Sequence, residues 1–266
     1  MNALDVKNLS LSYDGRPALK DLSLSIREGE FFVIIGPNGS GKTTLLKAIA
    51  GLIPSESAIT ILNQPLDRYS RRQLAQCLAV VPQQTPLDFP FTVADAVLMG
   101  RSPHLNFLAS EQREDYEIAR EAMRFTSIDH LAGRRLHQLS GGERQRVIIS
   151  RAICQQPRII LLDEPTASLD PAHQIHVMDL LLDLRATRKI TVVMVSHDLN
   201  LAAMYGDRLL LLHHGSAMRS GSPGQVLEKT LLEQAYGCPM LIDEHPLGKV
   251  PRVLPIPARF AKHDQD

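Results

Sequence analysis

The sequence predicts an α/β fold with a mainly parallel sheet, an antiparallel β subdomain at the N-terminal end and an inserted α-helical subdomain. Residues 3–12 and 19–26 alternate between apolar and polar, which is typical of antiparallel strands with one exposed face. From about residue 85 to 157 helical patterns dominate, which predicts an insertion. Four short apolar runs have the character of strands buried on both faces, at residues 31–35, 78–81, 159–162 and 190–195.

The composition is that of a soluble globular protein. Of 266 residues, 44% are hydrophobic and 22% are charged, which suits one large or two modest domains with a core. Lys and Arg together equal Asp and Glu at 29 each, so no basic excess indicates nucleic acid, and no nucleic-acid partner is expected. The three cysteines are odd in number and form no C-x-x-C pair, which favours a reducing cytosol over a disulfide framework.

No segment of the sequence is expected to cross a membrane. None approaches the roughly 18 consecutive apolar residues that a spanning helix requires, and the N-terminus lacks the apolar core of a signal peptide. We therefore expect a cytoplasmic chain. If it acts at a membrane, another chain must supply the spanning helices.

Residues 36–43 (GPNGSGKT) match the phosphate-loop pattern G-x-x-x-x-G-K-[ST]. The apolar run 31–35 precedes them and residues 44–51 keep a helical spacing, so the loop is predicted to join a strand to a helix. Its glycines let backbone N–H groups turn toward an anion, and the helix N-terminus adds positive charge. Lys42 would reach the β and γ phosphates and Thr43 would offer its hydroxyl to Mg²⁺; the alternative is a glycine-rich turn that happens to carry a lysine.

This strand, loop and helix predict the core of a P-loop NTPase. The residues expected to bind the nucleotide are Gly36, Pro37, Asn38, Gly39, Ser40, Gly41, Lys42, Thr43 and Thr44.

Tyr13 lies beside the turn residues Asp14 and Gly15, which separate the two alternating segments. It is either a surface tyrosine or the flat face on which an adenine stacks. Its position upstream of a phosphate loop favours stacking.

Gln83 follows the buried run 78–81, which comes after a short strand at 59–62 and a polar helical stretch at 71–77. Open α/β sheets bind ligands beyond the carboxyl ends of their strands. Gln83 is therefore a candidate to contact Mg²⁺ or an attacking water, and is otherwise a solvated loop residue.

A second anion-binding end is predicted inside the helical insertion. Ser140, Gly141 and Gly142 open the last of its three helical patterns, and a serine with two glycines at a helix start suits an anion. One ATP cannot easily contact both this end and the distant phosphate loop of the same chain. The second end is therefore expected to serve the nucleotide of another subunit. The three patterns cover residues 93–99, 111–125 and 147–153.

Two carboxylates end the apolar run 159–162. Because this run is predicted to be a buried parallel strand, Asp163 and Glu164 emerge at its carboxyl edge beside the phosphates. Asp163 suits Mg²⁺ held through water, and Glu164 suits the attacking water of a hydrolysis. The alternative is an ordinary strand end with solvated acids. In that case the occurrence of two such acids together with a phosphate loop in one chain would be accidental.

The remaining sequence returns to strands and helices. Asp170 precedes a helix at about 171–185, and the run 190–195 ends before His197. From that edge a histidine can bond a γ phosphate, although a lone histidine is more often structural. The C-terminal part is predicted to hold a hairpin, a final helix and an extended, proline-containing tail, at residues 209–221, 223–236 and 243–266.

Together these segments resemble the ATP-binding subunit of ABC transporters over residues 4 to about 236. We expect an ABC ATPase domain at 1–240, with the helical subdomain inserted at about 85–157, and a C-terminal extension at 241–266. The resemblance implies a homodimer in which ATP lies between one phosphate loop and the partner's Ser140, Gly141 and Gly142. The motifs that carry it occur in the family's order: Tyr13, GPNGSGKT, Gln83, LSGGE at 139–143, IILLDEP at 159–165, SLD at 168–170 and His197.

The resemblance also implies a role for each site residue. Tyr13 corresponds to the adenine-stacking residue and Asp170 to the dimer-contact aspartate. The expected catalytic residues are Glu164 as base, His197 as switch and Gln83 in the loop that senses Mg²⁺ and the membrane partner. The expected metal-binding residues are Thr43, Gln83 and Asp163. One departure is Glu143, where the commonest signature has glutamine, but Ser140, Gly141 and Gly142 are intact.

Residues 89–93 and 99–104 (FPFTV and MGRSPH) resemble the subfamily that serves importers of iron siderophores, haem and cobalamin. They follow Gln83, where the family docks its membrane subunit. Alternatively they only pack the insertion, and similar runs occur in oxyanion importers.

The resemblance implies an ATP-hydrolysing importer subunit at the cytoplasmic face of the membrane. It would close as a dimer on Mg-ATP and drive uptake of a metal chelate through separate permease subunits, with a solute-binding protein as indirect partner. The alternatives are an exporter, which usually looks like a cassette fused to spanning helices, an importer of another solute, such as an oxyanion, and a soluble ABC ATPase acting on nucleic acid or ribosomes. That last class resembles tandem cassettes or carries long coiled coils, whereas this chain has no internal repeat and no heptad run.

Overall fold

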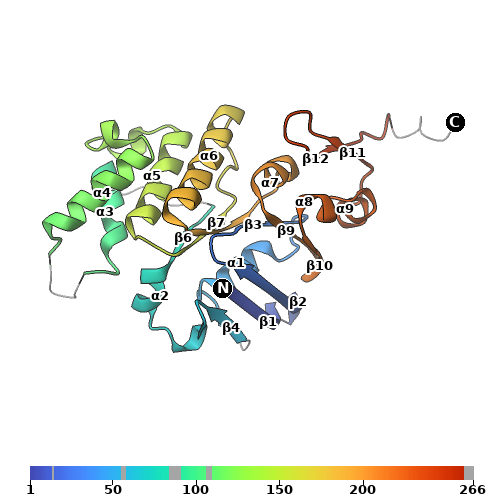
Figure 1. Ribbon diagram of the computed structural model, residues 1–266, viewed down its shortest axis with the longest axis horizontal. Helices are drawn as coiled ribbons and strands as arrows, with labels where there is room; N and C mark the ends of the chain where they lie inside the picture. Colours follow the sequence, from blue (N-terminus) through green and yellow to red (C-terminus); the bar gives the residue numbers. More distant parts are fainter. Residues whose placement is uncertain (14, 55–57, 84–90, 106–109, 261–266) are drawn as a thin grey trace.

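A six-stranded sheet lies at the centre of the molecule (Figure 1). The computed structural model describes residues 1–13, 15–54, 58–83, 91–105 and 110–260. The strands of the sheet are β3 (Phe31–Ile35), β6 (Leu78–Val81), β7 (Ile159–Asp163), β8 (Thr191–Val195), β9 (Arg208–His213) and β10 (Ser216–Gly221). Their order is β10-β9-β3-β8-β7-β6, and β10 pairs antiparallel with β9 while the other neighbours are parallel. The predicted α/β fold with a mainly parallel sheet is confirmed.

A second, antiparallel sheet is formed by the N-terminal part of the chain (Figure 1). Its strands are β1 (Asn2–Tyr13), β2 (Arg16–Arg27), β4 (Ala58–Ile61) and β5 (Gln64–Pro65), in the order β2-β1-β4-β5. The predicted alternation holds at Leu4 and Val6, and a register shift between Val6 and Leu9 interrupts it while keeping Leu9 buried. Helix α1 (Lys42–Ile49) joins the two sheets, because Leu45, Leu46 and Ile49 lie in the same core as that face.

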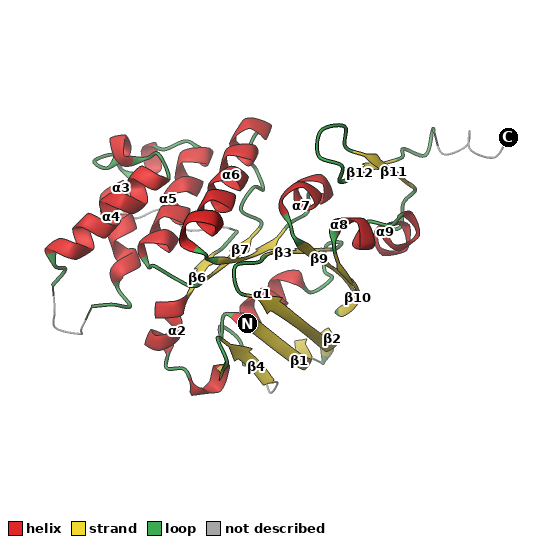
Figure 2. Ribbon diagram, viewed as in Figure 1, coloured by secondary structure: helices red, strands yellow, loops and turns green. Residues whose placement is uncertain are grey.

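Helices form a group beyond the β6 edge of the central sheet (Figure 2). Helices α3, α4 and α5 pack on one another there, while α2 precedes β6 and α6 connects β7 to β8. The start of the predicted insertion, at residue 85, lies outside the described residues, so its bounds stay a prediction. The helices are α2 (Arg71–Cys77), α3 (Val93–Leu98), α4 (Arg113–Phe125), α5 (Gly141–Cys154) and α6 (Pro171–Arg188).

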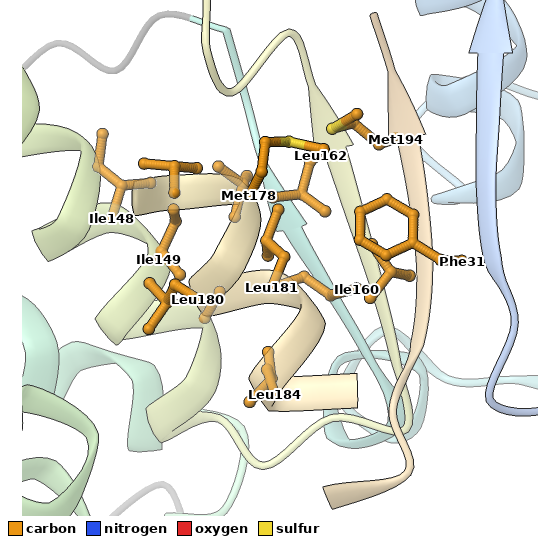
Figure 3. Close-up of a cluster of buried hydrophobic side chains, with 14 of the residues drawn as sticks. Phe31, Ile148, Ile149, Ile160, Leu162, Met178, Leu180, Leu181, Leu184 and Met194 are labelled. Atoms are coloured by element: carbon orange, nitrogen blue, oxygen red, sulfur yellow. The ribbon is translucent and has the colours of Figure 1, made fainter. Parts of the chain in front are cut away.

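The central strands are apolar throughout because both faces of the sheet are covered. Every residue of β3 is buried. Phe31 faces a core shared with α5 and α6, whereas the next residue, Phe32, faces the core shared with α1 and the N-terminal sheet. Figure 3 shows the first core, where Phe31 and Met194 of the sheet lie near Leu181 of α6. This two-sided packing holds the carboxyl ends of the strands in fixed relative positions.

The C-terminal part corrects two expectations. The helix predicted over 223–236 is two helices, because the chain is extended at Glu228 and Leu227 is buried between them. The predicted extended tail is wrong, since β11 and β12 form an antiparallel hairpin. Pro251 and Pro255 stand at the two ends of β12, where a missing N–H is tolerated. The elements are α7 (Leu199–Tyr205), α8 (Pro223–Val226), α9 (Lys229–Tyr236), β11 (Met240–Glu244) and β12 (Pro251–Pro255).

Within the described ranges, no helix combines the length and apolar character needed to cross a bilayer.

Candidate active site

The loop between β3 and α1 is held from outside by two strands. Gly36 and Gly41 have φ angles of 148° and 103°, in the region that side chains disfavour. A Cβ at Gly36 would collide with the carbonyl oxygen of Leu212 in β9, and one at Gly41 would lie 2.7 Å from the carbonyl oxygen of Ala18 in β2. Both positions therefore require glycine for their conformation and for the close approach of backbone.

A pocket of about 270 Å³ opens over this loop. It brings together the loop, Glu164 after β7 and His197, two residues beyond the end of β8, as the sequence predicts. Ala18, in β2, is a lining residue that the sequence analysis did not find. The lining is Ala18, Asn38, Gly39, Ser40, Gly41, Lys42, Thr43, Thr44, Glu164 and His197.

The loop has the donors that a polyphosphate needs. The hydroxyl of Ser40 is buried and has no hydrogen-bond partner among the described residues. Buried polar groups are normally paired, so a phosphate oxygen would satisfy this donor. The left-handed glycines and the start of α1 add backbone N–H groups. The residues present therefore fit a nucleotide's phosphates.

Lys42 is buried at the inner side of the loop. Its Nζ donates to the carbonyl oxygens of Gly36 at 2.8 Å and Pro37 at 2.9 Å. Burial lowers the pKa of Lys42, and the nearby carboxylates of Glu164 and Asp163 oppose that shift. The ammonium thus lies between the loop and the acids at the end of β7.

Thr43 and Asp163 meet at the floor of the site. Thr43 Oγ1 donates to Asp163 Oδ1 at 3.2 Å. Burial raises the pKa of Asp163, and the Thr43 hydrogen bond opposes that shift. A hydroxyl and a carboxylate are the hard oxygen ligands that Mg²⁺ prefers, so this pair fits the predicted ion.

Glu164, just after β7, is held between side chains that follow β6 and β8, the strands on either side of β7. Its Oε2 accepts from Gln83 Nε2 at 2.5 Å, and its Oε1 contacts Nε2 of His197. Its backbone is left-handed, with φ of 51°, and its N–H donates to the Val195 carbonyl at 3.1 Å. The structure therefore brings together the three predicted catalytic residues, because β6, β7 and β8 are adjacent and parallel.

The second predicted anion-binding end is the start of α5. Ser140 Oγ accepts from Glu143 N–H at 3.3 Å, and a Glu143 carboxylate oxygen accepts from Ser140 N–H at 2.7 Å. This capping box explains Glu143, since glutamate fills the cap as glutamine would. The Ser140 N–H bond lowers the pKa of Glu143. Of the described residues that line the phosphate-loop pocket, none comes from α5.

Tyr13 and Asp170 are not among the described residues that line the pocket. Tyr13 ends β1, pairs with Arg16 and exposes 47% of its surface, so its ring is free to stack. It is Ala18, rather than Tyr13, that lines the described pocket. Asp170 is the N-cap of α6 and bonds His173. Asp14, beside Tyr13, lies outside the described residues.

Known proteins are similar to this chain in sequence. A family model for ABC transporters matches residues 19–167. The hemin import ATP-binding protein HmuV of Pseudomonas aeruginosa is 42% identical over 249 residues, which cover 91% of this chain and 96% of that protein. The achromobactin transport ATP-binding protein CbrD of Dickeya dadantii is 36% identical over 256 residues, which cover 96% of this chain and 95% of that protein.

Solved structures agree. A metal-chelate type ABC transporter in an inward-facing conformation gives a TM-score of 0.85 at 32% identity, covering 96% of this chain and 98% of that one. A dimeric ATP-binding cassette with ADP and phosphate bound gives 0.72 at 33% identity, covering 82% of this chain and 98% of that one. The chain belongs to the ABC transporter family.

As an ABC transporter cassette, the chain binds ATP and hydrolyses it in support of transport. The pocket over the phosphate loop is where its described residues suit the phosphates.

Of the stretch that follows Gln83, at residues 89–93 and 99–104, some described residues are buried and others are exposed. Gly100 and Arg101 are buried, and Arg101 bonds Asp115 of α4 at 2.8 Å and the Cys154 carbonyl of α5 at 3.0 Å. Met99 is 41% exposed. Much of the MGRSPH stretch thus packs the helical group. Phe89 and Pro90 lie outside the described residues.

Proposed function

We propose that two copies of this cassette close on two Mg-ATP molecules, each held between one phosphate loop and the partner subunit's α5 start. The observation that carries the proposal is Gly141. No described atom lies within 4 Å of a Cβ built there, so a side chain at this position would meet open space. Nothing among its own chain's described residues requires glycine at that position. A close approach from outside the chain accounts for it.

The roles of the site follow from its contacts. Lys42 and Ser40 would hold phosphate oxygens, and Thr43 and Asp163, with Gln83 as a third ligand, would hold Mg²⁺, which when bound offsets phosphate charge. Glu164 accepts a proton from the attacking water, and Gln83 and His197 keep its carboxylate oriented. Tyr13 stacks on the adenine. Asp170 contacts the partner.

We further propose that this cycle drives import of a metal chelate, with haem as the favoured solute, at the cytoplasmic face of the membrane. Support comes from the hemin import relatives and from the metal-chelate type transporter of similar fold. Separate permease subunits would carry the solute, supplied by a solute-binding protein. The relative named for achromobactin transport makes achromobactin a second candidate solute.

The test begins with the native complex. The tagged chain is purified from its own membranes in mild detergent, and the co-purifying permease is reconstituted with it in liposomes. Uptake of haem, a ferric siderophore, cobalamin and molybdate is then compared with ATP on the cassette side. We expect ATP-dependent haem uptake that Glu164→Gln abolishes. Uptake of molybdate alone would contradict the solute class, and recovery of ribosomal proteins without a permease would contradict the importer.

A further inference from the structure

His173, in the first turn of α6, contacts two separate motifs of the cassette. One is Asp170, whose Oδ1 accepts from the backbone N–H of His173 at 2.9 Å and whose Oδ2 lies 2.7 Å from the ring Nδ1. A carboxylate can only accept, so Nδ1 carries the proton in this pair. The bonds from His173 lower the pKa of Asp170. One carboxylate therefore fixes both the helix start and the imidazole ring.

The other motif is the start of α5. A Cβ built at Gly142 would lie 3.0 Å from both Cγ and Nε2 of His173 and closer still to Cδ2. The imidazole thus occupies the space that a side chain at position 142 would need. Glycine is therefore suited to positions 141 and 142 for different reasons. Gly141 leaves its face open, and Gly142 admits the ring.

We propose that His173 is a positioning residue that couples Asp170 to the α5 start, so that both reach the partner subunit in a fixed relation. The inference rests on the ATP dimer proposed above and extends it to a residue outside the nucleotide-binding motifs. Capping α6 needs only the backbone bond from His173 to Asp170. The ring's contact with Gly142 is independent of that cap, and it connects the two surfaces.

Dimer formation tests the coupling directly. In a Glu164→Gln background, which slows hydrolysis, Mg-ATP should drive the full chain from monomer to dimer in sedimentation experiments. His173→Ala should weaken that dimer about fivefold, at the low end of typical couplings between sites, because both subunits lose the link between Asp170 and the α5 start. His173→Asn keeps a donor for Asp170 but lacks the ring, so it should fall between the two.

His176→Ala is the matched control, because His176 is exposed on the same helix. It should dimerise like the parent, and Tm without nucleotide checks that each variant folds. Equal dimerisation of the His173→Ala variant and the parent would overturn the coupling while leaving the proposed dimer intact. A Glu164→Gln parent that stays monomeric with Mg-ATP would instead overturn the dimer itself, and the coupling with it.

Discussion

Gln83 donates a hydrogen bond from Nε2 to Oε2 of Glu164 at 2.5 Å, which ties the end of β6 to the end of β7. Gln83→Ala removes one of the two side chains that orient Glu164 and leaves His197 in place. We expect ATP turnover to fall by about 10- to 100-fold, as for a misplaced catalytic group, while ATP affinity measured without Mg²⁺ is unchanged. Phosphate release and equilibrium nucleotide binding measure the two quantities. Unchanged turnover would show that Gln83 does not orient Glu164.

Asn200 of α7 pairs with β12 as a strand would. Its side chain accepts from Val253 N–H at 2.8 Å and donates to the Val253 carbonyl at 3.2 Å. Asn200→Ala should lower the free energy of opening of the β11–β12 hairpin by about 2 kcal/mol, since two hydrogen bonds are lost. Amide hydrogen exchange in β11 and β12 should then quicken roughly 30-fold.

Asn200→Asp is the matched comparison for the hairpin. It keeps the acceptor for Val253 N–H and loses the donor, so its exchange should be intermediate. If exchange in Asn200→Ala equals that of the parent, other contacts hold the hairpin to α7.

The buried ion pair of Arg101 and Asp115 should stabilise the helical group. Asp115→Asn leaves the guanidinium without its charged partner, so we expect a loss of about 3 kcal/mol in the free energy of unfolding. Denaturant titration measures it. Glu117→Gln is the control, because Glu117 pairs with Arg113 in solvent and should change stability little. Equal effects of the two substitutions would contradict the account.

The same pair predicts a pH dependence. The hydrogen bond from Arg101 is the main cause that lowers the pKa of Asp115 below its ordinary 3.8. A group whose folded pKa is lowered contributes stability above its unfolded pKa and loses it as the pH falls toward the folded value. Below about pH 4, the Asp115→Asn variant and the parent should therefore converge in stability. A gap that stays constant down to pH 2 would contradict this.

Patterns within one segment carried the prediction of the fold. The apolar run before Gly36 and the one before Asp163 indicate buried strands, and parallel strands put their ends at one edge. Glu164, Gln83 and His197 could be grouped in this way. Their mutual hydrogen bonds could not, because these depend on strand order in space.

Contacts between distant segments could not be predicted from the sequence. Leu212 and Ala18 approach the phosphate loop through their backbone carbonyls. Every residue type has this group, so the sequence does not indicate such a contact. The β11–β12 hairpin was missed because prolines in the tail favoured an extended chain, yet Pro251 and Pro255 only end a strand. No sequence pattern predicts the contact of His173 with Gly142 either, since it depends on how α6 packs beside α5.

The most direct test of the account compares Glu164→Gln with Lys42→Ala. Turnover is measured by phosphate release, and ATP affinity by equilibrium binding. Glu164→Gln should bind Mg-ATP like the parent and lose at least about 100-fold in turnover, as expected for a general base. Lys42→Ala should weaken binding itself. Near-normal hydrolysis by Glu164→Gln would contradict the assignment of Glu164 as the base in this site.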